Sequence, residues 1–496
     1  MKKIFNNELN LEMKGEIVHL YGWVQKNRNL GGLVFIDLRD RSGIVQLVVR
    51  PESEFYTEAE SLKSEYVIEV IGKVVERESK NSNLLTGDIE VEVEKLVVLN
   101  KSLDLPFTID DNTTALEETR LKYRYLDIRR NEIKDKLILR NNVMMACREY
   151  LSKLGFIEIE TPVLCKSTPE GARDFLVPSR QNKGKFYASP QSPQLFKQLL
   201  MVGGIERYYQ FSKCFRDEDL RADRQPEFTQ LDMELSFVSE DDIMAINEGL
   251  IAHVFKKVKD IDIKLPLMRM KYDDAIRNYG SDKPDLRFGM KIREITDLFK
   301  NSNFELFKNS EVVNCLVVKE SAPKYSRKSL DELSNFVKKY GLGGLAYLKI
   351  GNEITGSIAK ALSDEEKNIL KEELKLENDD LVLFGCGAYN KVKQALGALR
   401  SKLGKDLNLY KDSDYSLLWV VDFPSFEYSE EENRYVSCHH PFTMPKDEDV
   451  DKLLTDKANC YSKAYDMVIN GYEAGGGSIR IHDEKVQEKM FKALEL

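Results

Sequence analysis

A polar hairpin between Arg207 and Phe237 holds the side chains of this sequence that are best suited to chemistry. Residues 208–216 and 226–237 are expected to form two strands, joined by a loop rich in charged residues. Side chains alternate between the two faces of a strand, so one face of this hairpin should be polar and the other apolar. The expected polar face consists of Gln210, Ser212, Cys214 and Arg216 from the first strand and Gln230, Asp232, Glu234 and Ser236 from the second.

Two interpretations of this polar face are open. A half-buried sheet commonly turns its polar side to water, and the face would then bind nothing. The residue types favour a reactive face instead, because the planar fork of Arg216 suits a phosphate that gains negative charge during a reaction. Glu218 could accept a hydrogen bond from an amine or a 2′-hydroxyl group, neither of which a plain salt bridge requires.

A second candidate group lies at the start of a helix that is expected within residues 189–197. Pro193 can occupy the first turn of a helix. Gln194 and Lys197 are then three residues apart on one helix face. A lysine beside a glutamine is a fair receptor for a small carboxylate. The same pattern is common at helix N-termini that bind nothing, and both interpretations stay open.

The adjacent residues His439 and His440 suggest a metal site at first sight. Neighbouring residues on a strand point to opposite faces, however, and therefore chelate poorly. The sequence has no other His or Cys cluster with the spacing of metal ligands. We therefore expect a histidine here to donate a hydrogen bond to a substrate group.

Residues 466–482 combine two acidic side chains, a glycine run and an arginine. Asp466 and Glu473 could hold Mg²⁺ together with a polyphosphate through oxygen ligands. The glycines at 475–477 let the backbone approach a bound group closely. The segment is not a P-loop, because the Gly-Lys-Ser/Thr ending is missing. Glu473 and Arg480 have opposite parity in a regular strand, so the glycine run must break the register if both face one pocket.

The chain of 496 residues is too long for a single core, so two to four domains are expected to position these side chains. Residues 16–99 carry the pattern of an OB barrel, which is five short strands with a helix between the third and the fourth. The expected strands are 16–25, 33–38, 44–49, 66–75 and 88–98. Within them, Arg28, Phe35 and Gln46 could provide a cation, a stacking ring and a base-edge reader for single-stranded RNA. Phe35 could equally be a core residue.

The remaining sequence alternates between helical and extended patterns. Residues 100–120 are polar and aperiodic, as in a linker, and residues 131–154 keep a helical period that Gly155 ends. Residues 156–162 alternate as a strand that a proline stops. Between about 285 and 415, glycine clusters and a helix near residues 391–403 indicate a separate α+β module. Strands resume at 417–422 and continue to Arg480.

Composition and charge limit the classes of protein to consider. The chain is 42% hydrophobic and 32% charged, and no apolar run approaches the roughly 20 residues that span a bilayer, so no membrane partner is expected. The net charge of −9 argues against a generic nucleic-acid coat protein, although a large RNA could still bind to local basic residues. Seven scattered cysteines argue against a disulfide framework and for a reducing cytoplasm.

Taken together, these segments resemble class II aminoacyl-tRNA synthetases of the aspartate, asparagine and lysine subgroup. The resemblance covers nearly the whole chain and keeps the order of the motifs. The helix together with residues 155–162 looks like motif 1, an element of the dimer interface, and residues 215–237 look like motif 2. The module that follows residues 279–287 looks like that of bacterial aspartate enzymes, which the asparagine and lysine enzymes lack.

The resemblance implies a multidomain α+β fold. Its parts would be an OB-fold anticodon-binding barrel (1–100), a linker and hinge (101–130), a class II antiparallel-sheet catalytic domain in two pieces (131–284 and 416–496) and an inserted α+β domain (285–415). It also implies aspartate–tRNA ligation: aspartate attacks the ATP α-phosphate to give aspartyl-adenylate and pyrophosphate, and the aspartyl group then passes to the 3′ end of tRNA(Asp). The implied partners are L-aspartate, ATP with Mg²⁺, tRNA(Asp) and a second copy of the chain in a homodimer.

The family's site residues are carried over where the motifs match. Arg216 and Glu218 would be catalytic. The aspartate site would comprise Glu170, Gln194, Lys197, Arg216, Gln230, Asp232, His439 and Arg480. The ATP site would comprise Arg216, Asp217, Glu218, Gln225 and Glu473, with Asp466 and Glu473 holding Mg²⁺. The anticodon would contact Arg28, Phe35 and Gln46. Asparagine in this site would leave the cations of Lys197 and Arg480 unpaired, at a cost of several kcal/mol.

One departure from the family pattern leads to two alternatives. A third class II motif, with an arginine over the ATP γ-phosphate, should follow Arg480 after several dozen residues, whereas the sequence ends at Leu496; we therefore expect a chain without motif 3. One alternative is a non-catalytic RNA-binding paralogue or fragment, against which the retained polar face argues. The other is a relaxed ligase that also charges tRNA(Asn). Relaxed members tend to carry histidine and glycine where this sequence has Leu30 and Lys80, which favours strict specificity.

Overall fold

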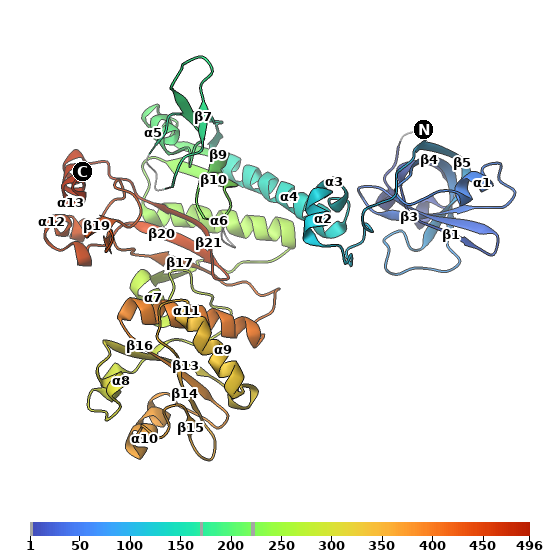
Figure 1. The fold of residues 1–496 in the computed structure, drawn as a ribbon. Coiled ribbons are helices and arrows are strands. Elements are labelled where there is room, and N and C mark those ends of the chain that lie inside the picture. Colours follow the sequence, from blue (N-terminus) through green and yellow to red (C-terminus); the bar gives the residue numbers. More distant parts are fainter. Residues whose placement is uncertain (1–2, 169–171, 220–223) are drawn as a thin grey trace. The chain divides into compact units, whose positions relative to one another are not determined.

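The computed structural model describes residues 3–168, 172–219 and 224–496 and divides into two compact units, residues 1–141 and 142–496 (Figure 1). The first unit contains a β-barrel and short helices, and the second contains three larger sheets with their helices. No helix in the described ranges is both long enough and apolar enough to cross a membrane.

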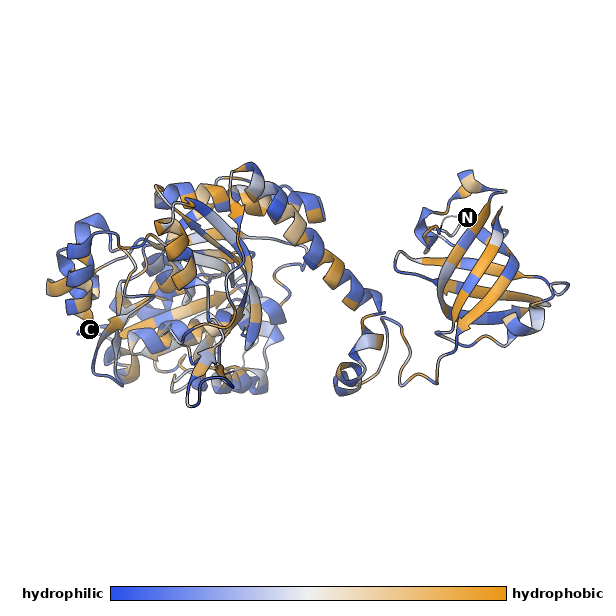
Figure 2. Ribbon diagram, turned by 90° about the horizontal axis from the view of Figure 1, so that it is seen from above, coloured by the Kyte–Doolittle hydropathy of each residue, from blue (hydrophilic) through white to orange (hydrophobic). Residues whose placement is uncertain are grey.

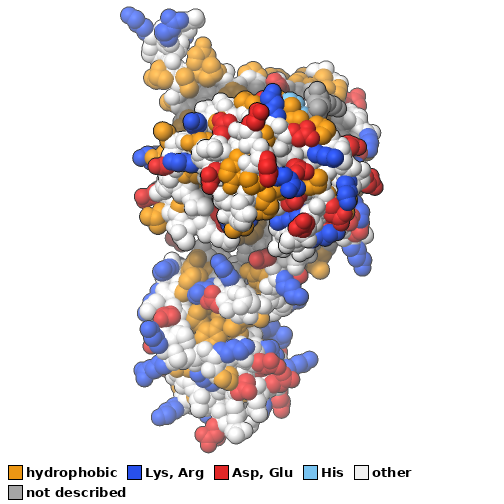
Figure 3. Space-filling view, turned by 90° about the vertical axis from the view of Figure 1, so that its right-hand side faces the viewer, with side chains coloured by type: hydrophobic (Ala, Val, Ile, Leu, Met, Phe, Trp, Pro, Cys, Tyr) orange, Lys and Arg blue, Asp and Glu red, His pale blue; other side chains and the backbone are white. Residues whose placement is uncertain are grey.

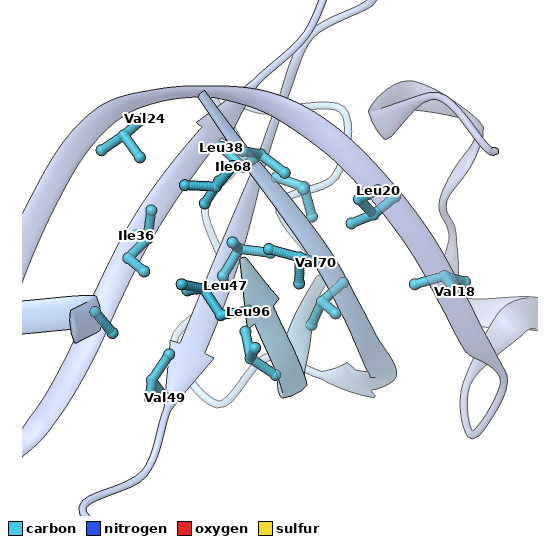
Figure 4. Close-up of a cluster of buried hydrophobic side chains, with 14 of the residues drawn as sticks. Val18, Leu20, Val24, Ile36, Leu38, Leu47, Val49, Ile68, Val70 and Leu96 are labelled. Carbon is cyan, nitrogen blue, oxygen red and sulfur yellow. The ribbon is translucent and has the colours of Figure 1, made fainter. Parts of the chain in front are cut away.

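A closed five-stranded barrel with the strand order β1-β2-β3-β5-β4 forms the core of the first unit. Its strands are β1 (Ile17–Leu30), β2 (Leu33–Arg39), β3 (Ile44–Val49), β4 (Val67–Glu76) and β5 (Ile89–Asn100), and α1 (Tyr56–Glu60) lies between β3 and β4. The expectation of an OB barrel is confirmed. Alternate apolar side chains such as Val34, Ile36 and Leu38 are fully buried inside the barrel, and Figure 4 shows such residues from several strands pointing toward one another. The hydropathy colouring marks the barrel strands as the apolar part of this unit (Figure 2).

The barrel is followed by a segment with two short helices, α2 (Glu117–Lys122) and α3 (Arg124–Asp127). Phe107, Ile109 and Leu126 form a small apolar cluster there. Buried Glu65 accepts hydrogen bonds from Arg39 at 2.7 Å and also pairs with Arg129 of this segment. The long helix α4 (Asn131–Lys153) then leads into the second unit, within one residue of the expected helix.

Two sheets of the second unit carry the candidate site residues. The first has the order β10-β9-β6 and consists of β6 (Ile157–Glu158), β9 (Arg207–Phe215) and β10 (Glu227–Leu235). The second has the order β11-β17-β20-β21 and consists of β11 (Met268–Lys271), β17 (Leu417–Val421), β20 (Ala464–Ile469) and β21 (Tyr472–Ser478). The helix α6 (Glu240–Lys259) packs against both sheets, with Leu250 beside the first and Met244 beside the second.

The inserted module is a sheet between two layers of helices (Figure 1). Its strands, in the order β12-β13-β16-β14-β15, are β12 (Arg293–Glu294), β13 (Val312–Val318), β14 (Ala346–Lys349), β15 (Thr355–Gly356) and β16 (Leu381–Gly387). The helices α9 (Arg327–Lys338) and α11 (Tyr389–Asp406) cover one face, while α8 (Glu305–Lys308) and α10 (Asp364–Glu373) cover the other. The face drawn in Figure 3 mixes cationic and anionic side chains, in line with the modest net charge.

Shorter elements complete the second unit. They are β7 (Leu176–Pro178), β8 (Phe186–Ala188), α5 (Gln194–Val202), α7 (Tyr272–Tyr279), β18 (Phe426–Ser429), β19 (Arg434–Ser437), α12 (Lys452–Thr455) and α13 (Glu484–Leu494). Short 3-10 turns cover Asn6–Glu8, Leu11–Met13, Thr296–Phe299, Ala322–Lys324, Asp447–Asp449 and Lys457–Asn459. The strand expected at 156–162 is wrong in length, since β6 has only two residues. The division into five domains stays a prediction.

Candidate active site

The polar face of the β9–β10 hairpin is buried. Register pairs Gln230 with Ser212 and Asp232 with Gln210, which places these side chains on one face as the alternation predicts. Gln210, Ser212 and Asp232 are at most 9% exposed, so the interpretation of a face turned to water is wrong. The opposite face carries Tyr209 and Leu231, which pack against α4 and α6. A buried polar face has to be satisfied by other polar groups, and α5 supplies them.

Lys197 of α5 reaches this face. Its ammonium lies 2.7 Å from Oδ1 of Asp232 and 3.4 Å from Oε2 of Glu234, and its side chain is 8% exposed. The expected position of Lys197 and Gln194 on one face of α5 is matched by the burial of both residues. The ion pairs also correct the argument about the cost of binding asparagine. Lys197 already has carboxylate partners, so it would not be left unpaired when asparagine enters.

Arg480 approaches the same group from the end of β21. Its Nη2 donates to Oε1 of Gln194 at 3.1 Å, and its Nε lies 3.8 Å from Oε1 of Glu234. The guanidinium also lies over the ring of Phe442, with which the imidazole of His440 stacks. Nε2 of Gln194 is buried without a hydrogen-bond partner among the described residues. The cluster therefore offers two cations, two carboxylates and one amide donor within a few ångströms.

A β-bulge interrupts the pairing of β20 with β21 between Glu473 and Gly475. Asp466 pairs with Gly476, but two positions further along β20 Val468 pairs with Glu473, so one residue of β21 is extra. A Cβ at Gly476 would lie only 2.2 Å from Oδ1 of Asp466 and 3.6 Å from Oε1 of Glu473. The expected break in the register is present, at Ala474 directly before the glycine run, and the carboxylates of Asp466 and Glu473 converge above Gly476. That Glu473 and Arg480 face one pocket stays a prediction.

The electrostatics of this second group favour a cation. Burial, followed by the charges of Glu473 and Asp282, raises the pKa of Asp466 to about 8, whereas Lys283 acts in the opposite direction. Nζ of Lys283 lies 3.2 Å from Oε2 of Glu473. Carboxylates crowded in this way repel one another, and added positive charge would relieve that repulsion.

Both histidines have lowered pKa values, and the expectation that one of them donates a hydrogen bond to a substrate group stays a prediction. Burial lowers the pKa of His440 to about 4, and the nearby cations Arg480, Lys197 and Arg216 add to the effect. The imidazole of His440 is therefore neutral at pH 7. The pKa of His439 is also lowered, by desolvation first, while Glu473 opposes this shift. The cations Lys197, Arg216 and Arg480 therefore act on His440, and the carboxylate of Glu473 acts on His439.

The loop after β9 carries the expected nucleotide ligands. The guanidinium of Arg216 lies over the ring of Phe228, 5.1 Å from its centroid, and among the described residues it has no carboxylate within 4 Å. Glu218 pairs with Arg224 at 2.7 Å. Asp217 and Gln225 are exposed. Glu170, expected to cover the substrate's amino group, lies outside the described residues.

The comparisons with known proteins agree with this geometry. A family model described as "tRNA synthetases class II (D, K and N)" matches residues 116–496, and one described as "OB-fold nucleic acid binding domain" matches residues 18–99. An aspartate–tRNA(Asp/Asn) ligase of Geobacillus sp. (strain WCH70) is 54% identical over 97% of this chain and 82% of that protein. An aspartate–tRNA ligase of Streptococcus agalactiae serotype III (strain NEM316) is 52% identical over 99% of this chain and 85% of that protein. The chain belongs to the aspartate–tRNA ligases of class II.

Solved structures support the fold of this aspartate–tRNA ligase chain. The aspartyl tRNA synthetase from Entamoeba histolytica has a TM-score of 0.57 at 18% identity and covers 99% of this chain and 81% of that one. The asparaginyl-tRNA synthetase from Pyrococcus horikoshii has a TM-score of 0.50 at 23% identity and covers 81% of this chain and 96% of that one. At these identities the likeness concerns the fold alone.

The barrel of the ligase holds its candidate anticodon residues in one polar group. Arg28 pairs with Asp37 and lies 3.4 Å from Oε1 of Gln46, whose Nε2 donates to Glu90 at 2.7 Å. Phe35 pairs with Arg28 across β1 and β2 and alternates with the buried Val34 and Ile36. The interpretation of Phe35 as a core residue is therefore wrong, since its ring is only partly buried.

Several residues of the ligase site carried no functional assignment from sequence. Gln191 is buried and holds the preceding loop, accepting from Ala172 N at 3.0 Å and donating to Ala172 O at 2.8 Å. Glu234 was recognised only as part of a polar face, and Lys283 only as part of a landmark before the inserted module. No pattern in the sequence marks Gln191 as buried. Glu234, in contrast, has the same strand parity as Asp232, and this parity could have assigned Glu234 to the site.

Proposed function

We propose that the chain activates L-aspartate with ATP and transfers it to tRNA(Asp), using the residues gathered around Lys197 and Arg216. The α-carboxylate of aspartate attacks the ATP α-phosphate, aspartyl-adenylate and pyrophosphate form, and the aspartyl group then passes to the 3′ end of the tRNA. Arg216 stabilises the negative charge that develops at the α-phosphate, and no covalent enzyme intermediate is required.

The observation that carries this proposal is the pattern of charge around α5. Aspartate has one ammonium and two carboxylates, and the site offers the cations of Lys197 and Arg480 beside the carboxylates of Asp232 and Glu234. The carboxylates of aspartate replace Asp232 and Glu234 as partners of Lys197 and Arg480. The ammonium of aspartate then pairs with the carboxylates of Asp232 and Glu234. Gln194 supplies an amide donor that is buried and has no hydrogen-bond partner in the described part of the chain. Glu170 is proposed to complete the amino-group contact.

The nucleotide is proposed to bind between the loop after β9 and the bulge of β21. Arg216, Asp217, Glu218 and Gln225 supply contacts from the loop, and Glu473 supplies one from the bulge. Asp466 and Glu473 provide the hard oxygen ligands that Mg²⁺ prefers, and the raised pKa of Asp466 fits a site that awaits positive charge. Bound Mg²⁺ would neutralise phosphate charge during the displacement.

The third motif of class II enzymes is proposed to lie outside residues 1–496. The relatives are longer than this chain, which covers 82–85% of their length. Aspartate-dependent ATP–pyrophosphate exchange, measured on the full-length protein, tests this activity. We expect Arg216→Ala to lower the exchange rate about 10²-fold or more, as when a transition-state charge contact is removed. Near-normal exchange in this variant, or wild-type exchange that does not depend on aspartate, would contradict the proposal and favour a non-catalytic role.

Strict specificity for tRNA(Asp) is the proposed form of the activity. The relatives include proteins named aspartate–tRNA ligase and aspartate–tRNA(Asp/Asn) ligase at 52–54% identity, so overall similarity does not decide the tRNA specificity. Leu30 is exposed, and Lys80 lies 3.5 Å from Asp88 and 3.6 Å from Glu76. The barrel residues Arg28, Phe35 and Gln46 are proposed to contact the anticodon. Equal charging of tRNA(Asp) and tRNA(Asn) would overturn strict specificity.

A homodimer in the cytoplasm is the proposed state of the protein. Within the second unit, the helix α4 exposes Met145, and neighbouring β6 exposes Ile157. Exposed apolar side chains of this kind on motif 1 suit a two-fold interface that buries the same patch on both copies. Sedimentation should report a dimer for the wild type and a monomer for Met145→Glu. A wild-type monomer at micromolar concentration would contradict this part of the proposal.

A further inference from the structure

Lys283 reaches the carboxylates that are proposed to hold Mg²⁺. Its Nζ lies 3.2 Å from Oε2 of Glu473 and 3.5 Å from Oδ2 of Asp282. Glu473 in turn converges with Asp466 above Gly476. The ammonium of Lys283 therefore lies within ion-pairing distance of Asp282 and of Glu473.

The loop around Lys283 is restrained by its own contacts. Asp285 accepts from Arg287 at both carboxylate oxygens, with 3.0 Å from Nε and 2.7 Å from Nη2. The guanidinium of Arg287 lies over the ring of Tyr410, 3.7 Å from its centroid. Pro284 directly follows Lys283 and fixes one backbone angle. Lys283 is thus presented by a held backbone, unlike a freely moving surface lysine.

The inserted module supplies further anchors for this loop. Arg400 of α11 is 1% exposed and donates to the carbonyl oxygens of Asp285 at 2.8 Å and Phe288 at 3.0 Å. The end of α7 also approaches α11 closely, since a Cβ at Gly280 would lie 2.9 Å from Cα of Gly397. The position of Lys283 therefore depends on the helix α11 of the inserted module.

We propose that Lys283 is the resident counter-ion of the nucleotide site: it neutralises Glu473 before the metal–nucleotide complex binds, and the metal ion displaces it. The inserted module holds the loop from which it acts. This inference rests on the proposed assignment of Glu473 to Mg²⁺ and ATP. A Mg²⁺ ion needs ligand oxygens at about 2.0–2.1 Å in near-octahedral geometry, so it competes with the ammonium for the same carboxylate.

Calorimetric titration with α,β-methylene-ATP and Mn²⁺, without aspartate, tests the displacement. We expect Lys283→Met to bind this complex about two- to fivefold more tightly than wild type, the effect of removing a partly exposed ion pair that must otherwise be broken. Lys283→Arg keeps the charge and should bind as wild type does. With EDTA in place of Mn²⁺, Lys283→Met should gain no affinity for the nucleotide.

Two results with Lys283→Met would overturn the inference. Weaker binding both with Mn²⁺ and with EDTA would mean that Lys283 contacts phosphate directly, and unchanged binding with Mn²⁺ would mean that it does not compete with the metal. Lys271→Met is the matched control. Lys271, at the end of β11, lies near Asp422, and its replacement should leave the affinity unchanged. Melting temperatures report whether each variant is folded. A wild-type chain that binds no nucleotide would contradict the proposed function as well. If the wild type binds the nucleotide and Lys283→Met gives either of the two results above, only the inference about Lys283 is overturned.

Discussion

Replacing Lys197 by methionine tests the charge arrangement at the centre of the site. The ammonium of Lys197 lies 2.7 Å from Asp232 and 3.4 Å from Glu234, with only 8% of the side chain exposed. Methionine keeps an apolar stem of similar length but leaves the Asp232 carboxylate buried without its cation. Breaking a buried pair in this way typically costs about 3–5 kcal/mol of folding free energy. Urea unfolding should therefore show a midpoint well below that of the wild type.

The same substitution should weaken substrate binding independently of stability. If Lys197 binds a carboxylate of aspartate, its loss removes a charge-assisted hydrogen bond of about 1.5–3 kcal/mol, which is roughly 10- to 150-fold in the dissociation constant. Calorimetric titration with L-aspartate, at a temperature where the variant is folded, measures this change.

A double variant separates the two effects of Lys197→Met. Asp232→Asn in the same chain removes the charge left behind, so the free energy of unfolding should recover in part, because the uncompensated charge is the larger cost. Aspartate binding should stay weak, since the cation is still absent. The reasoning is refuted if Lys197→Met unfolds at the wild-type urea concentration and binds aspartate with wild-type affinity.

Four further substitutions, one of them a control, probe the glycine bulge, the inserted module and the partly buried His440. Gly476→Ala would force a Cβ to within 2.2 Å of Asp466 and should lower the exchange rate about 10- to 100-fold. Gly475→Ala is its control. A Cβ there meets no described atom within 4 Å, so the rate should stay near wild type. Arg400→Met strips donors from four backbone carbonyls and should lower the free energy of unfolding by about 3 kcal/mol in urea melts. The folded-state pKa of His440 is about 4 and its ordinary value is 6.5, so the unfolded chain binds more protons between these values and stability falls as pH drops through this window. His440→Gln should remove up to about 3 kcal/mol of that fall, and an unchanged pH profile would contradict the assigned burial.

The alternation of polar residues along the hairpin was sufficient to predict which side chains share a face. Because the period of a strand is two, Gln230 and Asp232 must lie together whatever packs above them. The same rule identified the barrel, where Val34 and Ile36 are buried and Phe35 between them is not. It also required a break in the register if Glu473 and Arg480 face one pocket, and β21 has a bulge at Ala474. These local rules do not depend on distant parts of the chain.

Contacts between distant segments were not predictable in this way. The pairing of Lys197 with Asp232 joins residues 35 positions apart, and that of Arg480 with Gln194 joins residues 286 positions apart. For this reason the cost of admitting asparagine was overestimated from the residue types alone. The hydrogen bonds of Gln191 and the approach of Lys283 to Glu473 likewise depend on how loops fold back, for which alternation and composition carry no signal.

The sequence by itself therefore determined the barrel and the polar hairpin, the composition of their faces and, through its motifs, the resemblance to a ligase. These properties follow from short-range periodicity and from residue types that only a few chemistries require. The tertiary structure decided whether the polar face meets water or protein, which carboxylates each cation already holds, and where Lys283 lies. Burial and charge pairing are properties of the space between elements, and that space is defined only when the sheets, α5 and the inserted module are packed together.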